Sequence, residues 1–477
     1  MKTLKDLFHN VNVLSFDVNM DTTVEGIEVN SQKVSNNFIF FALKDNGYAK
    51  DAIDNGAICI VTETKIENMP CICVNEIRKV LCTVCAEFYD NPHINMHFIG
   101  VVGTNGKTTT THIINHILHE SGKKTCLIGT LGVKINCEYD IPFDMTTPDP
   151  NEFYKILNEA KNNLVEYVIM EVSAHAIYFE KLHGIVMDYC VFTNVSQDHL
   201  DFFKDMNTYT KVKERYFNAD NVRLGIINAD DIVGRRIIDC KEICCLSYGL
   251  YYPSDVFALN IEYDKGSTSF VANVFDDVAF VKTPLLGEFN VSNTLAAVSV
   301  CKVIGISTND ICQFLVTLPQ IEGRFDVITN QKTAIIDYAH TPDGLKNAIL
   351  AARKLCKGKL IVVFGCGGNR DTNKRPIMGE IAAKYSDITV ITSDNPRFEN
   401  PEDIIESIAA GFAEISHSYI KICDRQKAIE FALSIADKND IVLIAGKGGE
   451  DYLDIKGEKL PYSDKEVCQK ILRRFDS

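Results

Sequence analysis

The sequence lacks any apolar run long enough to cross a membrane, and its first residues, 1–6, lack the apolar core of a secretory signal peptide. It is also short of positive charge, because 49 lysines and arginines stand against 64 aspartates and glutamates, a formal net charge of −15. This balance disfavours nucleic acid as a partner. We therefore expect a cytoplasmic protein with neither a membrane nor a nucleic acid among its partners. We also expect a monomer, although neither charge nor composition indicates the oligomeric state.

No second cysteine pair stands at zinc-ribbon distance from the lone C-x-x-C of Cys82 and Cys85. The 17 cysteines are scattered, and many lie inside apolar runs such as 58–60. This placement is typical of a reducing compartment, where cysteine packs as a small apolar residue. For Cys82 and Cys85 we favour packing on a helix over a metal site.

Neither an internal repeat nor a low-complexity linker divides the 477 residues, but the length suits about three domains. Short apolar runs alternate with helical segments, which indicates an α/β protein. We predict a small α/β N-terminal domain at 1–97, a central domain with a mostly parallel sheet at 98–321, and a C-terminal Rossmann-like α/β domain at 322–477. In the last of these, strands are expected at 333–337, 359–364, 387–392 and 440–445.

The segment 98–112 carries the strongest functional signal. An apolar strand runs into a glycine-bracketed turn, and the turn opens a helix whose first residues are Lys107 and Thr108. Glycines let backbone N–H groups approach a polyphosphate, the helix N-terminus supplies partial positive charge, Lys107 adds a full charge, and the Thr108 hydroxyl can ligate Mg²⁺. Position 101, where the standard P-loop has its first glycine, is valine, and the alternative is a βα turn without a nucleotide. We interpret the segment as a site for ATP and Mg²⁺, and the central domain at 98–321 as a P-loop-type ATPase domain with a mostly parallel sheet.

Two further strand ends carry residues suited to a metal. Glu171 follows the apolar run 168–170, and His199 lies in the polar segment 194–201 that follows another apolar run. Parallel strands bring such residues to one edge of a sheet. Together with Thr108 they can bind Mg²⁺ beside the phosphates, although each alone is as easily a surface or capping residue.

The loop 102–109 resembles the phosphate loop of the Mur ligases, the ATP-dependent enzymes that build the peptide stem of peptidoglycan. The resemblance covers nearly the whole chain, because other blocks of that family follow in its order: 171–175, 192–194, 198–201, 287–293, 322–325, 337–343, 365–370 and 374–376. The combination is most similar to the family member that adds the third residue of the stem.

This resemblance implies a reaction in which ATP phosphorylates the D-Glu carboxylate of UDP-MurNAc-L-Ala-D-Glu. The amine of meso-diaminopimelate then attacks the acyl phosphate. Two other activities stay open at this point, namely the same ligase adding L-lysine or another amino acid, and a folylpolyglutamate-synthetase-like ligase. A homologue that binds without catalysis is disfavoured by the intact Lys107, Glu171 and Lys213.

The resemblance also assigns roles around the nucleotide. The residues implied to be catalytic are Lys107, Glu171, His199 and Lys213, and those implied to hold Mg²⁺ are Thr108, Glu171, His199 and Lys213. Lys213 aligns with a family lysine carried as a carbamate, an anion that can ligate the metal, and Lys211 is its competitor. The residues implied to bind ATP are Gly103, Thr104, Asn105, Gly106, Lys107, Thr108, Thr109, Asn290, Arg324, Asp337 and His340.

The residues implied to bind the UDP-linked acceptor depart from the family pattern at several positions. They are Ser31, Thr146, Thr147, Ser173, Phe179 and Lys181. Ser31 lies in Asn-Ser-Gln where the family has Asp-Ser-Arg, and Lys181 replaces an arginine, so the bidentate fork is lost. Phe179 stands where some members have glutamine, and the loop 44–50 is shorter than usual.

The choice of amino acid depends on the segment 393–397, Ser-Asp-Asn-Pro-Arg, which follows the apolar run 388–392. It resembles the family signature for meso-diaminopimelate, although a loop with Asp394 as a helix cap is an alternative. Diaminopimelate carries a distal carboxylate that lysine lacks, and an arginine can bind it bidentately. The residues implied to bind the amino acid are Arg370, Asp394, Asn395, Pro396 and Arg397, with Gly446 and Glu450 for the distal amino group. Gly449 stands where the family usually has histidine.

Overall fold

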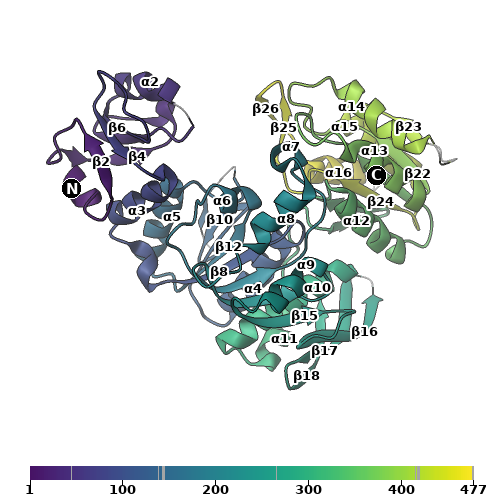
Figure 1. The fold of residues 1–477 in the computed structure, drawn as a ribbon. Coiled ribbons are helices and arrows are strands. Elements are labelled where there is room, and N and C mark those ends of the chain that lie inside the picture. Colours follow the sequence, from purple (N-terminus) through teal and green to yellow (C-terminus); the bar gives the residue numbers. More distant parts are fainter. Residues whose placement is uncertain are drawn as a thin grey trace.

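The computed structural model describes residues 1–44, 46–137, 139–141, 145–264, 266–413, 415 and 419–474. Three lobes follow one another along the chain, each built around a large sheet of its own, and the purple N-terminal lobe stands apart from the green and yellow C-terminal lobe (Figure 1). The α/β class predicted from the sequence is confirmed. Each predicted segment holds one of these sheets, while the boundaries themselves stay predictions.

The N-terminal lobe contains a five-stranded sheet in the order β2-β7-β6-β5-β4, parallel except for β2. Strands such as β5, Phe-Ile-Phe-Phe, are apolar without interruption because both faces of a mostly parallel sheet are covered. The elements of this lobe are β1 Lys2–Thr3, α1 Leu4–Leu7, β2 Val13–Phe16, β3 Thr23–Val24, β4 Gly26–Glu28, η1 Ser31–Lys33, β5 Phe38–Phe41, η2 Asn46–Tyr48, α2 Ala49–Asp54, β6 Ala57–Thr62, β7 Cys71–Val74, α3 Ile77–Phe88 and η3 Pro92–Asn95.

The central lobe contains an 11-stranded sheet in the order β11-β10-β9-β12-β8-β13-β14-β15-β16-β17-β18. The strands from β9 to β16 run parallel, and the other strands continue the sheet as antiparallel hairpins at both edges. Strand β8, which leads into the phosphate loop, lies between β12 and β13. The carboxyl ends of these three strands therefore meet, as the sequence predicts.

The bounds of the central elements follow the apolar runs of the sequence closely. They are β8 His97–Val102, α4 Lys107–Glu120, β9 Thr125–Gly129, β10 Gly132–Ile135, β11 Tyr139–Ile141, α5 Pro150–Asn162, β12 Tyr167–Val172, α6 Ala174–Tyr178, β13 Met187–Phe192, α7 Leu200–Phe203, α8 Met206–Glu214, β14 Val222–Asn228, α9 Ile232–Cys240, β15 Cys244–Gly249, β16 Val256–Asp264, β17 Ser267–Val274, β18 Asp277–Thr283, α10 Glu288–Ile304 and α11 Thr308–Val316. Glu171, predicted to follow its strand, is the penultimate residue of β12.

The C-terminal lobe is a doubly wound domain with a six-stranded sheet in the order β19-β20-β24-β21-β22-β23, parallel except for β19. Helices α12, α13 and α14 pack on one face, and α15 and α16 pack on the other. The elements are β19 Asp326–Thr329, β20 Thr333–Asp337, α12 Pro342–Leu355, β21 Leu360–Phe364, α13 Lys374–Tyr385, β22 Ile388–Ile391, α14 Pro401–Ala409, η4 Ala410–Phe412, β23 Tyr419–Lys421, α15 Arg425–Ile435, β24 Ile441–Ala445, β25 Tyr452–Ile455, β26 Glu458–Pro461 and α16 Asp464–Arg473.

A fully buried ion pair fixes two loops of this lobe. Arg425 Nε and Nη2 donate to the two carboxylate oxygens of Asp464, at 2.8 and 2.7 Å. The same guanidinium donates to the carbonyl oxygens of Ser393 and Ala445, at 3.2 and 3.0 Å. Ala445 is the last residue of β24, and Ser393 lies two residues beyond the end of β22. Arg425 therefore holds both predicted amino-acid loops at one edge of the sheet.

All 17 cysteines lie among the described residues, and each is a free thiol. Cys82 and Cys85 are buried in α3, which confirms the prediction that they pack on a helix. Burial raises the pKa of the Cys82 thiol to about 12, so it stays protonated and behaves as an apolar group. Separately, the described residues include no helix with both the length and the apolar character needed to cross a bilayer.

Replacing Asp464 by asparagine is expected to destabilise the C-terminal lobe by about 3–5 kcal/mol, because it leaves the buried Arg425 charge unpaired. Urea unfolding followed by far-UV circular dichroism measures this effect. The control is Glu406→Gln, which breaks the exposed ion pair with Lys421 and should cost less than about 1 kcal/mol. Similar small shifts for both variants would contradict the structural role of the buried pair.

Candidate active site

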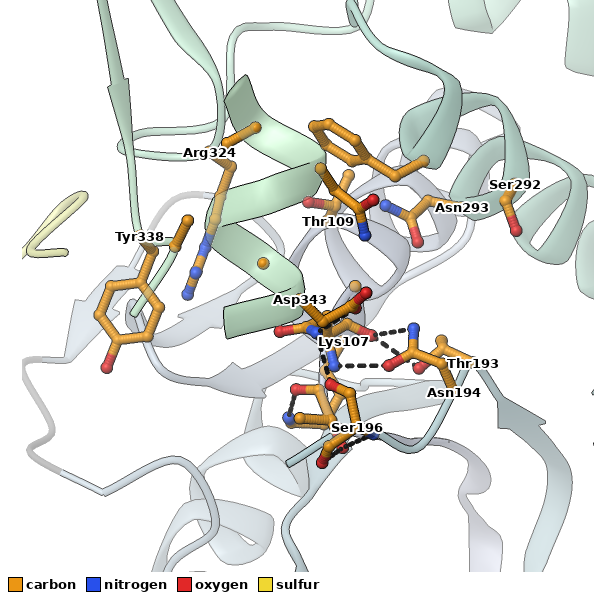
Figure 2. Close-up of a pocket in the computed structure, with 18 of the residues that line it drawn as sticks. Lys107, Thr109, Thr193, Asn194, Ser196, Ser292, Asn293, Arg324, Tyr338 and Asp343 are labelled. Atoms are coloured by element: carbon orange, nitrogen blue, oxygen red, sulfur yellow. Dashed lines mark hydrogen bonds between the residues drawn. The ribbon is translucent and has the colours of Figure 1, made fainter. Parts of the chain in front are cut away.

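A cavity of about 740 Å³ opens at the carboxyl ends of β8, β12 and β13, between the central and C-terminal lobes. Figure 2 shows Arg324 and Tyr338 reaching in from the C-terminal side, opposite Thr193, Asn194 and Ser196 of the central lobe. Twelve of the residues predicted from the sequence line it: Thr104, Asn105, Gly106, Lys107, Thr108, Thr109, Thr146, Glu171, His199, Arg324, Asp337 and His340.

The phosphate loop requires glycine at two positions for reasons visible in the packing. Gly106 has φ +87°, and a Cβ there would lie 2.4 Å from Asn293 Oδ1. A Cβ at Gly103 would lie 1.8 Å from Thr193 Oγ1. Helix α4 begins at Lys107, so the first N–H groups of the helix face the cavity.

Lys107 is held against the loop that it follows. Its Nζ donates to the carbonyl oxygens of Gly103 and Thr104, at 3.0 and 2.9 Å. Burial lowers the pKa of Lys107, while the nearby Glu171 and Asp198 carboxylates act in the opposite direction. A cation is thus placed where the loop can receive an anionic group.

Glu171 is buried and organised by the loop after β9. Its carboxylate accepts from the backbone N–H of Thr130 at 2.8 Å and from the Thr130 hydroxyl at 3.1 Å. The Glu171 carbonyl accepts from the Thr147 hydroxyl at 2.9 Å, and that hydroxyl is 3.2 Å from Ser173 Oγ. Thr146 joins the group through Thr130, with 3.2 Å between the two hydroxyls. The structure therefore brings together Glu171 and three residues predicted to bind the acceptor.

Asp198, which sequence reasoning did not select, joins the two lobes at the cavity. Its carboxylate lies 3.3 Å from His199 Nε2, 3.6 Å from His340 Nε2 and 3.9 Å from Lys374 Nζ. Burial acts to raise the pKa of Asp198, but these neighbours, His340 above all, hold it well below its usual value. Burial likewise lowers the pKa of His199 to about 3, which keeps the imidazole neutral, as a metal ligand must be.

Lys213 lies just behind the cavity wall, and Lys211 does not. The Lys213 side chain is fully buried, whereas Lys211 is exposed on the same helix, α8. Lys213 Nζ lies 3.0 Å from Thr104 Oγ1 and 2.6 Å from the Tyr209 hydroxyl. Burial, reinforced by the nearby Lys107 cation, lowers the pKa of Lys213 far below its usual value.

The C-terminal lobe supplies groups that face the phosphate loop directly. Arg324 Nη2 donates to the Thr108 hydroxyl at 2.9 Å, and its guanidinium lies 4.2 Å from the centre of the Tyr338 ring. The Asp337 carboxylate accepts from the N–H groups of Phe325 and Ala339, at 2.7 and 2.8 Å. Burial raises the pKa of Asp337.

Asn290, predicted to contact the nucleotide, lies one layer behind the wall. Its Nδ2 donates to the Leu286 carbonyl at 2.8 Å, and its Oδ1 accepts from Asn293 Nδ2 at 3.1 Å. Asn293, one helical turn further along α10, lines the cavity instead. Among the residues described, Asn290 acts on the cavity through Asn293.

The oxygen donors in the cavity suit a Mg²⁺ ion that keeps much of its hydration shell. Thr108 and Glu171 offer hard oxygen donors, and both line the cavity beside Lys107. The described residues contain no cluster of three or more His, Cys, Asp or Glu side chains able to hold a metal by themselves. Mg²⁺ commonly binds one or two protein oxygens together with water and substrate phosphates, so this sparse set fits.

The residues predicted for the UDP end do not all meet in this cavity. Lys181 pairs with Asp149 at 2.8 Å and lies 3.4 Å from the Thr147 carbonyl, beside the acceptor group. The guanidinium of Arg78, a residue of the N-terminal lobe, lies over the Phe179 ring, 4.3 Å from its centre. Ser31 lies in η1 of the N-terminal lobe, and Asp45 of the predicted short loop 44–50 lies outside the described residues.

The residues predicted for the amino acid lie at the carboxyl ends of β21, β22 and β24. Arg397, with φ +51°, donates from Nη1 to the Gly368 carbonyl at 2.7 Å and lies 3.6 Å from Asp454 Oδ2. Pro396 precedes it, and a Cβ at Gly367 would meet Arg397 Nη1 at 2.9 Å and Arg370 Cγ at 3.8 Å. The two arginines therefore flank one glycine, although Arg370 is exposed and 3.8 Å from Asp201.

The partner loop, 446–450, is built around glycines. Gly446 has φ +116°, and a Cβ there would lie 2.5 Å from Asp394 Oδ2. A Cβ at Gly449 would lie 3.1 Å from Leu131 of the central lobe, so the loop packs against that lobe. Asn395 Nδ2 donates to Glu450 Oε2 at 2.9 Å, which brings the two predicted loops into contact.

Known protein families match both lobes that form the cavity. The chain matches the Mur ligase middle domain over residues 101–301 and the Mur ligase, glutamate ligase domain over residues 323–448. It is 41% identical over 457 residues to the UDP-N-acetylmuramoyl-L-alanyl-D-glutamate--2,6-diaminopimelate ligase of Aquifex aeolicus, covering 94% of both chains. The chain belongs to the Mur ligase family.

Other Mur ligases match this chain over at least 95% of its length. The enzyme of the same name from Clostridioides difficile is 37% identical, with 99% of this chain and 100% of that one covered. A solved structure with that name superposes with a TM-score of 0.69 at 27% identity, covering 100% of this chain and 99% of the other. The MurF ligase of Thermotoga maritima, solved in complex with ADP, shares the fold with a TM-score of 0.67 at 21% identity, over 95% of this chain and 99% of that one.

Replacing Lys107 by alanine is expected to lower the rate of ADP release at least roughly a hundredfold, because it removes the cation aimed at the phosphates. Steady-state ADP release measures this, and circular dichroism checks that the fold is intact. Lys155→Ala, an exposed lysine on α5, serves as the control and should retain the parent rate. Near-normal turnover of the Lys107 variant would rule out the phosphate-loop assignment.

Proposed function

We propose that this Mur ligase uses ATP to join meso-diaminopimelate to the D-Glu carboxylate of UDP-MurNAc-L-Ala-D-Glu. The support is the cationic phosphate loop in the cavity, the contact between the two loops that carry Arg397 and Glu450 at the carboxyl edge of the C-terminal sheet, and the names of its full-length relatives. We also infer that the protein works as a monomer in the cytoplasm.

The proposed reaction makes a poor electrophile reactive. A carboxylate oxygen of the acceptor attacks the γ-phosphorus of ATP, the bond to the β–γ bridging oxygen breaks, and ADP leaves. The amine of the amino acid then attacks the acyl carbon, loses a proton, and expels phosphate from the tetrahedral intermediate. Lys107 and the first N–H groups of α4 stabilise charge on the transferring phosphoryl group. When bound, Mg²⁺ neutralises phosphate charge, and Thr108, Glu171 and His199 would hold it.

We propose that Lys213 carries a carbamate. An amine adds to CO₂ only in its neutral form, and burial beside Lys107 lowers the pKa of Lys213 so that this form is accessible. The nitrogen–carbon bond forms as the amine loses a proton, and the product is an anion. The carbamate therefore puts a negative charge where a protonated Lys213 would put a positive one. This anion can pair with Lys107, and its oxygens can ligate Mg²⁺.

We assign the amino-acid preference to charge complementarity at the two C-terminal loops. Arg397 would bind the distal carboxylate of diaminopimelate, and Glu450 with Gly446 the distal amino group. Lysine offers only the ammonium, so it would lack the carboxylate contact with Arg397 and would place two cations close together. Arg370 flanks the same glycine and would add positive charge on the carboxylate side.

Lys213→Ala is expected to lose most activity, and Lys211→Ala, on the exposed side of α8, to keep it. Short carboxylates should restore part of the activity of Lys213→Ala, because they can occupy the position of the carbamate oxygens. Steady-state rates with and without added formate or acetate measure this. Full activity of Lys213→Arg, which cannot form the carbamate, would refute the role.

With both amino acids at equal concentration, meso-diaminopimelate should be incorporated over L-lysine by at least roughly a hundredfold, the scale of one charge-assisted pair of about 3 kcal/mol. Mass spectrometry of the products measures the ratio. Arg397→Ala should reduce it, whereas Arg473→Ala, at the end of α16, should leave it unchanged. Comparable incorporation of the two by the parent enzyme would overturn the proposed substrate.

A further inference from the structure

Lys447 has no role in the chemistry proposed so far, yet it is the centre of a buried polar cluster. Its side chain is fully buried in the loop that follows β24. Lys447 Nζ donates to Asn395 Oδ1 and to Glu450 Oε2, each at 3.0 Å. Asn395 and Glu450 come from the two loops assigned to the amino acid, so one ammonium group ties both together.

The same contacts fix the orientation of the Asn395 amide. Asn395 Oδ1 also accepts from the backbone N–H of Asp454 at 2.9 Å. Since Lys447 and this N–H are both donors, the oxygen must face them and the NH₂ group must face Glu450. Without Lys447, one of the two reasons for this orientation is lost.

Glu450 is left with one oxygen available for a ligand. Its Oε2 accepts from both Lys447 and Asn395, at 3.0 and 2.9 Å. Among the residues that the structure describes, its Oε1 has only the Tyr338 hydroxyl nearby, at 3.5 Å, and the side chain is 21% exposed. A carboxylate anchored through one oxygen and open at the other can receive an ammonium group in a defined direction.

The cluster is also balanced in charge. Burial acts to raise the pKa of the adjacent Asp394, but Lys447 and Arg425 outweigh it and hold this pKa below its usual value. The loops thus present two carboxylates, Asp394 and Glu450, around one buried ammonium and one buried guanidinium. A neutral residue at 447 would leave Glu450 with only Asn395 and Tyr338 to orient it.

We propose that Lys447 is a positioning residue for the amino-acid substrate: it holds Glu450 and Asn395 so that Glu450 Oε1 receives the distal ammonium of meso-diaminopimelate. This inference rests on the proposed function. Lys447 itself does not touch the substrate, so its loss should weaken recognition of the distal amino group and leave recognition of the distal carboxylate, by Arg397, in place.

The test compares three amino acids with purified enzyme, ATP and the UDP-linked dipeptide. They are meso-diaminopimelate, 2-aminoheptanedioate, which lacks the distal amino group, and L-lysine, which lacks the distal carboxylate. For Lys447→Met we expect KM for diaminopimelate to rise at least roughly tenfold, with kcat and KM for ATP within about threefold. The preference for diaminopimelate over 2-aminoheptanedioate should fall to near unity, while the preference over lysine persists.

A double-mutant cycle separates positioning from general damage. Glu450→Gln should lose the same discrimination, and Lys447→Met with Glu450→Gln should behave like Glu450→Gln alone, because Lys447 acts through Glu450. In the double variant, no carboxylate at position 450 is left without the ammonium of Lys447, so this variant serves if the single variant folds poorly. Lys427→Met, an exposed lysine on α15, is the matched control and should match the parent enzyme.

Two outcomes would overturn the inference while the proposed function stands. One is an unchanged preference for diaminopimelate over 2-aminoheptanedioate in Lys447→Met. The other is tighter binding of diaminopimelate by that variant, which would mean that Lys447 repels the substrate ammonium. If the parent enzyme itself shows no preference for diaminopimelate over lysine, the proposed function falls, and the inference falls with it.

Discussion

The half-buried Lys107 and the fully buried Lys213 lie close enough for the first to depress the pKa of the second, and the site is arranged around this constraint. Both contact Thr104, Lys107 through its carbonyl and Lys213 through its hydroxyl. Two cations in so small a space would repel each other strongly. The arrangement is stable if Lys213 is neutral or carbamylated, which leaves Lys107 as the one cation directed at the phosphates. The same burial that makes the position costly for a cation makes the amine reactive toward CO₂.

The second requirement is that the activated carboxylate be kept near the amine that attacks it. The central lobe provides the phosphate loop, and the C-terminal lobe meets it through Arg324 on Thr108 and through His340 and Lys374 around Asp198. The edge of the C-terminal sheet that carries Asp337 also carries the amino-acid loops, which Arg425 fixes from behind. Contacts at the phosphate loop and at the amino-acid loops are therefore set by one rigid sheet, which places the amine relative to the acyl group.

Features that depend on local sequence were predictable. The phosphate loop needs glycine because of backbone conformation and close approach, and the strands of the C-terminal sheet are continuous apolar runs bounded by polar residues. Strands predicted at 333–337 and 440–445 are found at Thr333–Asp337 and Ile441–Ala445. Glu171 was assigned to the end of a strand and lies in its last two residues, because a strand that delivers a buried carboxylate keeps its hydrogen bonds up to that point.

Features that depend on packing between distant segments were not predictable. Asn293 rather than Asn290 lines the cavity because the side of α10 that carries Asn293 is the one turned towards the cavity. Sequence spacing alone does not reveal this orientation of the helix. The role of Asp198 is not visible in the sequence because its partners, His340 and Lys374, come from another lobe. The burial of Lys213 and the exposure of Lys211 follow from how α8 packs. No motif in the sequence marks Lys447 or Arg425, and the fold shows that each is buried beside a carboxylate.

The proposed reaction depends on the acyl phosphate intermediate, and the transfer of a carboxylate oxygen to phosphate reports on its formation. The D-Glu carboxylate of the UDP-linked dipeptide is labelled with ¹⁸O, and the inorganic phosphate released during ligation is analysed by ³¹P NMR or mass spectrometry. We expect one ¹⁸O atom in each phosphate formed, because the carboxylate oxygen that attacks the γ-phosphorus leaves with it. Unlabelled phosphate, formed at the same rate as the amide product, would contradict it.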